Sequence, residues 1–327
     1  MQDRPLTPVA HPAAGAPSAE SALAASVLRT LAYFAVFRHP LTAPEVFESC
    51  DEPDARPTPV REALAALVRR GCVRQEGAYY ALADAESRAA DAVDARRQAE
   101  TRCEQMIPLA YRYSRLIARF PFVRGVCVSG SLSKGVAEAD ADVDYFIVTA
   151  PGRLWVCRTL LTLFKKTVLL NSHRYFCLNY FVDQDHLAIP NRNRYTATEL
   201  AFLLPTYDYA TYAALRQANA WVGDYLPHQL LRPAGAVAGR ADSWLKRGAE
   251  TLLAGGVGEW LEARCRALTC AYRRRRFAYL SDEEFGHAMR ATQGVATHHP
   301  RSFQNRVLRA YEERLAALRQ RFGFPLL

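Results

Sequence analysis

The sequence predicts a multidomain α+β chain with an N-terminal three-helix unit, a small central α/β domain with a mixed sheet, and an all-helical C-terminal domain. Apolar residues recur at helical spacing over much of residues 21–85. Short apolar runs typical of strands fill residues 123–195, and the pattern is almost wholly helical over 196–327. At 327 residues, half of them apolar, the chain is long enough for two or three domains.

Residues 1–20 are rich in Pro and Ala, which predicts a disordered leader. After it, helices are predicted from Ala25 to Phe37, from Thr42 onward and from Pro59 to Arg70. Thr42 precedes Glu45 by three residues, a capping-box spacing. A short hairpin follows within residues 72–82. This order of three helices and a hairpin in residues 21–85 resembles winged helix-turn-helix domains.

A winged helix often binds DNA through its third helix, which here carries Arg61, Arg69 and Arg70. Glu62 lies on the same helix, and few of its side chains suit base readout. We therefore expect an accessory or docking role and keep DNA binding as the alternative. Residues 86–122 are predicted to form a helical connector, charged in its first part and apolar in its second.

The central segment contains the residues that carry chemistry. A buried strand around Val126–Val128 leads into Gly130-Ser131, and after ten intervening residues Asp142-Val143-Asp144 opens a strand that runs to Thr149. A glycine turn lets backbone N–H groups approach a triphosphate. Residues two apart on a strand point the same way, so Asp142 and Asp144 are predicted to share one face. Paired carboxylates suit Mg²⁺, which prefers oxygen ligands.

This pattern resembles the DNA polymerase beta superfamily of nucleotidyltransferases, over roughly residues 123 to 185. The resemblance implies an enzyme that uses two Mg²⁺ ions to move a nucleoside monophosphate from a nucleoside triphosphate to a hydroxyl. Asp142 and Asp144 would be catalytic and metal-binding, and Gly130 and Ser131 would bind the nucleotide. The acceptor stays open among nucleic acid, protein and small molecules.

The resemblance also implies a third carboxylate from a neighbouring strand, within Tyr175–Asp183. By period-two alternation Asn179, Phe181 and Asp183 share a face. Three alternatives remain: Asn179 replaces the acid, Asp183 supplies it, or the acid is missing and the protein binds nucleotide without turnover. The last alternative predicts a non-catalytic, nucleotide-sensing or DNA-binding regulator.

Ser133 and Lys134 are predicted to lie near the phosphates, one through its hydroxyl and the other as a point charge. The polar loop Asn191–Tyr195 is interpreted as a surface loop, with an acceptor or phosphate pocket as the alternative. Arg273–Arg276 is the densest basic run, and we expect it to be spread around a solvated helix rather than gathered on one face.

The net charge of +9 is compatible with polyanionic partners, but an arginine-rich composition gives the same value. The eight cysteines are scattered without a Cys-x-x-Cys pair, which favours reduced thiols and a cytoplasmic location. The longest apolar stretch, Leu154 to Phe164, is interrupted by Arg158 and too short to span a bilayer, so no membrane association is expected.

Overall fold

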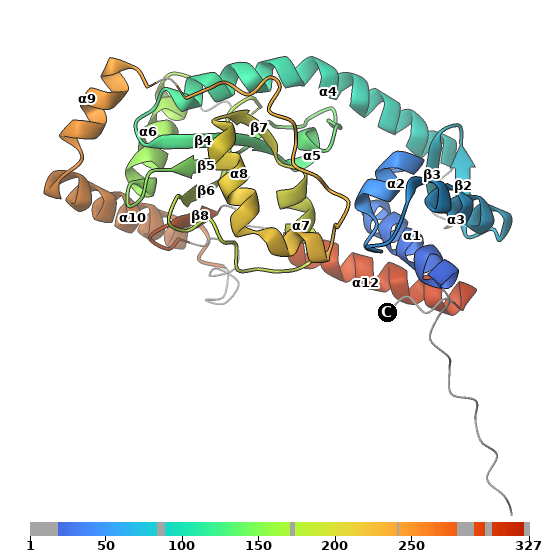
Figure 1. Cartoon of the computed structure of the whole chain (residues 1–327). Helices are drawn as coiled ribbons and strands as arrows, with labels where there is room; N and C mark the ends of the chain where they lie inside the picture. Colours follow the sequence, from blue (N-terminus) through green and yellow to red (C-terminus); the bar gives the residue numbers. More distant parts are fainter. Residues whose placement is uncertain are drawn as a thin grey trace, which may run out of the picture.

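The computed structural model describes residues 19–83, 89–170, 174–240, 242–279, 291–297 and 303–323. The chain is α+β with mixed sheets, as the sequence predicts (Figure 1). All but the last two residues of the predicted leader lie outside the described residues.

The N-terminal unit contains the predicted order of three helices and a hairpin. Its elements are α1 (Ala19–Ala35), β1 (Leu41–Thr42), α2 (Ala43–Ser49), α3 (Pro57–Arg69), β2 (Val73–Glu76) and β3 (Tyr79–Leu82). The strands form a small sheet in the order β1-β3-β2, in which β1 was not predicted. The Glu45 carboxylate accepts a hydrogen bond from the Thr42 N–H at 2.8 Å, so the predicted capping residues do start α2.

The last described helix, α12 (Phe303–Phe322), packs on this N-terminal unit (Figure 1). Its Val307 and Leu318 belong to the core that α1 and α3 form, and the Tyr311 ring meets the Tyr33 ring edge-on with centroids 5.5 Å apart. The last described helix therefore packs against the first.

A five-stranded sheet lies at the centre of the molecule. It is composed of β4 (Val123–Ser129), β5 (Asp144–Thr149), β6 (Cys177–Asp183), β7 (Leu204–Tyr207) and β8 (Val295–Thr297), in the order β7-β4-β5-β6-β8. β5 and β6 are parallel and are connected through α6 (Leu154–Thr167), whereas the other neighbours are antiparallel. The prediction of an all-helical segment after residue 196 is wrong at β7 and β8, whose short runs are edge strands of this sheet.

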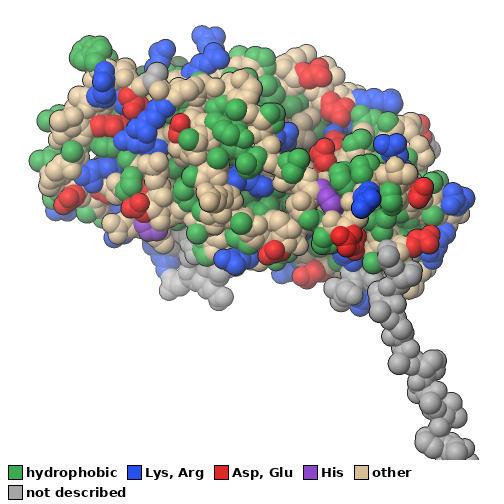
Figure 2. Space-filling view, viewed as in Figure 1, with side chains coloured by type: hydrophobic (Ala, Val, Ile, Leu, Met, Phe, Trp, Pro, Cys, Tyr) green, Lys and Arg blue, Asp and Glu red, His purple; other side chains and the backbone are tan. Residues whose placement is uncertain are grey.

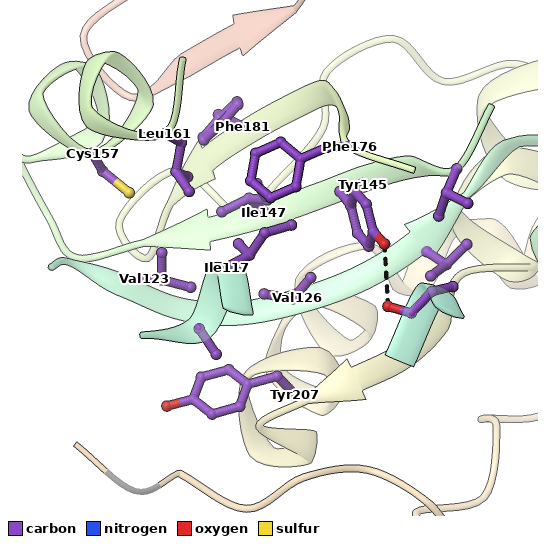
Figure 3. Close-up of a cluster of buried hydrophobic side chains, with 14 of the residues drawn as sticks. Ile117, Val123, Val126, Tyr145, Ile147, Cys157, Leu161, Phe176, Phe181 and Tyr207 are labelled. Carbon is purple, nitrogen blue, oxygen red and sulfur yellow. Dashed lines mark hydrogen bonds between the residues drawn. The ribbon is translucent and has the colours of Figure 1, made fainter. Parts of the chain in front are cut away.

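Helices cover both faces of the central sheet. On one face, α4 (Ala89–Ala118) and α6 pack on alternate residues of β4 and β5, including Val126, Tyr145 and Ile147 (Figure 3). The Tyr145 hydroxyl is satisfied there by donating to the Ala110 carbonyl at 3.1 Å (Figure 3). On the other face, α7 (Arg194–Ala201) and α8 (Tyr209–Ala218) pack on Phe146 and Val148.

The remaining described elements are the short helix α5 (Gly130–Ser133), η1 (Ala220–Asp224), α9 (Trp244–Leu252) and α10 (Gly256–Arg276). Arg273 of the basic run is buried and the next three arginines are exposed, as expected for a run that winds around a helix. Basic and acidic side chains are interspersed over the face seen in Figure 2. Among the described residues, no helix has the length and apolar character needed to cross a membrane.

Candidate functional site

The turn that follows β4 lies directly against the start of β5. Gly130 begins the short helix α5 (Gly130–Ser133) with φ of +69°, and its neighbour Ser129 pairs in register with Asp144. A Cβ placed on Gly130 would lie 2.7 Å from the Asp144 Oδ2 atom. Both the left-handed conformation and this close approach require glycine. The structure therefore brings the predicted Gly130 turn and Asp144 together.

Ser133 lies outside the cavity, unlike the other predicted nucleotide-binding residues. Its side chain is buried, and its hydroxyl donates to the Gly130 carbonyl at 2.9 Å. The residue is absent from the lining of the cavity described below. A hydroxyl committed to the backbone of its own turn stabilises that turn rather than binding a ligand.

Lys134 also contacts the turn, because its Nζ atom donates to the Gly130 carbonyl at 3.0 Å. The same Nζ atom forms an ion pair with Glu199 of α7 at 2.9 Å. Lys134 lines the cavity together with Ser131 and Gly130. Three of the four predicted nucleotide-binding residues thus lie on one wall.

The pKa of Asp144 is raised to about 6. Burial is the main cause, because it penalises the charged carboxylate, and the negative charges of Glu199 and Asp142 act in the same direction. A hydrogen bond with Cys177 and the positive charge of Lys134 act in the opposite direction. A bound cation would stabilise the ionised form of this carboxylate, because its positive charge offsets the free-energy cost of ionisation.

Asp142 is exposed and precedes β5. It lies close enough to Asp144 for its charge to raise the Asp144 pKa, although it does not itself line the cavity. Among the described residues, no group of three or more His, Cys, Asp or Glu side chains is arranged to hold a metal ion. Mg²⁺ in nucleotide sites is commonly held by one or two carboxylates plus substrate phosphates. Asp144 offers one such carboxylate at the cavity wall, and Asp142 is an exposed second carboxylate outside the cavity lining.

Asp183 cannot supply the third carboxylate. Cys177 of β6 pairs with Asp144, and Asp183 pairs with Thr149 at the opposite end of β5, about 17 Å away at the usual strand rise. Asp183 is buried and is already bonded, accepting from the Gly152 N–H at 3.3 Å and pairing with His186 at 2.5 Å. This prediction is therefore wrong, because strand direction separates the two acids.

Asn179 does line the cavity. The register between β5 and β6 shifts after the pair Tyr145–Leu178, so that Phe146 pairs with Tyr180 and Asn179 is an additional residue. This bulge breaks the alternation on which the predicted shared face of Asn179, Phe181 and Asp183 depended. Asn179 and Tyr180 both line the cavity, and Phe181 is buried in the core under α4 and α6.

A cavity of about 910 Å³ lies beside this turn, near the upper end of the range of small-molecule sites. One wall is the Gly130 turn with the start of β5 and the middle of β6, and another is α7. The N-terminal unit supplies a third wall. The residues contributed by α1 and the segment after it are Tyr33, Phe34, Phe37, Arg38 and His39.

The sequence did not predict that the N-terminal unit lines this cavity. Contacts between distant segments hold the unit in place, among them the Arg194 guanidinium donating to the Ser49 carbonyl at 2.6 Å and the stack of Phe47 on His228 at 4.5 Å. Of the predicted polar loop, Asn191 and Tyr195 line the cavity. Arg194, by contrast, is buried between the two parts of the chain.

The outer face of α3 points away from the cavity. Arg61, Arg69 and Arg70 are exposed on it, and none of the described residues that line the cavity belongs to α3. The N-terminal unit meets the cavity through α1, and the predicted docking role of this unit stays a prediction.

Glu199 is a carboxylate in the cavity that the sequence did not mark. It lies on α7, the helix that packs against the β5 face carrying Asp144 and Phe146. No local motif surrounds it, and its proximity to Asp144 comes only from the packing of α7. A helix N-cap at Asn193, which accepts from the Thr196 N–H at 3.0 Å, was the one readable signal in that segment.

Comparison of the chain with models of known protein families, with curated proteins and with solved structures gives no match. The function is therefore argued from the geometry of the site.

Proposed function

We propose that this protein is an Mg²⁺-dependent nucleotidyltransferase, with a nucleoside triphosphate as donor and a hydroxyl group as acceptor. The observation that carries the proposal is the contact between the Gly130 turn and Asp144 at the wall of the cavity. The glycine turn lies directly against the carboxylate there, and ionising this partly buried carboxylate costs free energy. A carboxylate that lines a cavity and has its pKa raised by burial is typical of a functional site.

Each of these residues would have a separate role in the reaction. The Gly130-Ser131 turn offers unhindered backbone to the phosphates, and Lys134 adds a positive charge beside them. Asp142 and Asp144 would hold Mg²⁺, which neutralises phosphate charge and polarises the reacting oxygen atoms when bound. Positioning and charge neutralisation account for most of the catalysis in phosphoryl-transfer reactions.

The N-terminal unit and α12 are proposed to form the acceptor side of the cavity. Phe34, Phe37 and Phe303 contribute aromatic surface to the cavity. This surface is compatible with nucleic-acid, protein and small-molecule acceptors.

A second candidate function is a nucleotide-sensing regulator that binds DNA through its N-terminal unit. Two observations favour it: the β6 residues that line the cavity, Asn179 and Tyr180, carry no carboxylate, and Arg61 of α3 is exposed. The regulator would keep the nucleotide site without transfer. A salt-dependent shift of DNA by the full-length chain, lost in Arg61→Ala, is expected only under this alternative.

The test of the primary proposal is transfer of label from α-labelled NTPs with Mg²⁺, using total RNA, protein extract and pooled aminoglycosides as separate acceptors. Wild-type protein should release pyrophosphate with one of them, and Asp144→Ala should abolish the release. Asp140→Ala is the matched control, since Asp140 is an exposed acid on the same cavity. Binding of NTP without pyrophosphate release from any acceptor would favour the regulator.

A further inference from the structure

Glu199 is a carboxylate that lines the cavity from a helix and that the strand pattern of the sequence did not predict. In the proposed reaction one acid is missing, because Asp183 lies at the far end of β6 and Asn179 carries an amide. Glu199 reaches the same cavity from α7 instead of from a strand.

A short chain of contacts connects Glu199 to the turn and to Asp144. Its Oε1 atom lies 2.9 Å from the Lys134 Nζ atom, and that Nζ atom lies 3.0 Å from the Gly130 carbonyl oxygen. Gly130 in turn lies against the Asp144 carboxylate. The side chains of Lys134 and Glu199 are 15% and 28% exposed, so both remain accessible to a ligand that enters the cavity.

The pairing in the ligand-free cavity has a consequence for substrate binding. Lys134 contacts the turn that would receive the phosphates, and in the absence of ligand it is paired with Glu199. A triphosphate offers Lys134 several charged oxygens, which form stronger hydrogen bonds than neutral acceptors do. When Lys134 turns to the phosphates, the Glu199 carboxylate loses its partner beside Asp144.

We propose that Glu199 is the proton acceptor of the proposed transfer, held by Lys134 in the empty cavity and released when the triphosphate binds Lys134. This inference rests on the proposed function. The acceptor hydroxyl gives its proton to the Glu199 carboxylate while its oxygen forms a bond to the α-phosphorus. The bond between the α-phosphorus and the bridging oxygen breaks, and pyrophosphate leaves with that electron pair.

The experiment compares Glu199→Gln with Glu138→Gln, an exposed acid on the same cavity. The binding probe is α,β-methylene ATP, which cannot release pyrophosphate. Glu199→Gln should bind it about 2- to 5-fold more tightly than wild type, because an ion pair of this kind no longer competes for Lys134. Glu138→Gln should bind it as wild type does.

Turnover is then measured as pyrophosphate release from ATP with Mg²⁺, using total RNA and pooled aminoglycosides as acceptors. At saturating ATP, kcat of Glu199→Gln should fall about 10²- to 10⁴-fold, the usual contribution of a general base. Glu199→Asp, which keeps a carboxylate, should retain more turnover than Glu199→Gln. A role confined to folding would affect both variants alike and would leave the ATP affinity unchanged.

The inference is overturned if wild type turns over and Glu199→Gln keeps kcat within about threefold, well short of the general-base contribution. It is also overturned if Glu199→Gln binds the analogue more weakly than wild type. Absence of pyrophosphate release from wild type is a different result, since it contradicts the proposed function itself.

Discussion

We predict that the ionised Asp144 carboxylate destabilises the ligand-free protein. The Asp144→Asn variant, which cannot ionise at this position, should therefore be more stable than wild type. Burial raises the pKa of the folded carboxylate to about 6, compared with 3.8 for the unconstrained group. Each pKa unit corresponds to about 1.4 kcal/mol, so ionising Asp144 in the folded state costs about 3 kcal/mol. Solvent screens a partly exposed side chain and lowers this cost, so we expect the free energy of unfolding of the variant to exceed that of wild type by about 2 kcal/mol at pH 8.

The direction of the pH dependence follows from the raised pKa. Above pH 6 the folded protein carries the full cost of the charge, and the cost declines as pH falls towards 3.8, where the unfolded chain also takes up the proton. The amide that replaces the carboxylate in the variant cannot ionise, so the advantage of the variant over wild type should be largest at pH 8 and nearly absent at pH 4.

Urea unfolding at pH 8 and pH 4, with EDTA to exclude metal ions, measures this difference. Asp140→Asn serves as control, because Asp140 is exposed and its substitution should change the free energy of unfolding by less than about 0.5 kcal/mol at both values. A variant no more stable than wild type at pH 8, or one equally stabilised at pH 4, would refute the assignment of a partly buried carboxylate with a raised pKa.

Three further substitutions test the site and the core. Gly130→Ala should destabilise the protein by more than Gly135→Ala in urea unfolding, because both residues have positive φ but only Gly130 would clash with Asp144. Equal losses of stability in the two variants would contradict the close approach of Gly130 to Asp144. Tyr145→Phe should cost about 0.5–1.5 kcal/mol in the same assay, since it removes one of two side-chain hydrogen bonds to the buried Ala110 carbonyl, the other coming from the Ser114 hydroxyl at 2.9 Å. Glu262→Ala should lower the melting temperature measured by circular dichroism, because Glu262 accepts from the Trp155 and Val156 N–H groups at 2.8 Å each, and an unchanged value would exclude this role.

Local patterns predicted much of the fold. The continuous apolar run after Asp144 predicted β5 with its observed bounds, and helical spacing with the Thr42 and Glu45 pair predicted α2. The edge strands β7 and β8 were missed because each has only three or four residues. Strands this short carry too little periodicity to be distinguished from a helical context, and their pairing with β4 and β6 depends on contacts distant in sequence.

The candidate site was predictable where its residues share one local segment. Gly130 and Asp144 were predicted because the turn and the strand lie close together in the sequence, and the antiparallel pairing of β4 with β5 brings them into contact. The third acid was not predictable from β6, since the bulge at Asn179 and the parallel direction of the strand are tertiary features. Glu199 and the wall from α1 were missed for the same reason.

Binding of ATP to the full-length protein by calorimetry, with Mg²⁺ and then with EDTA, tests the central claim most directly. The geometry of the turn and the carboxylate predicts saturable, Mg²⁺-dependent binding that Gly130→Ala and Asp144→Asn both abolish and that Asp140→Asn leaves intact. ATP binding that is unaffected by either substitution, or no binding at all, would contradict a nucleotide site at this turn.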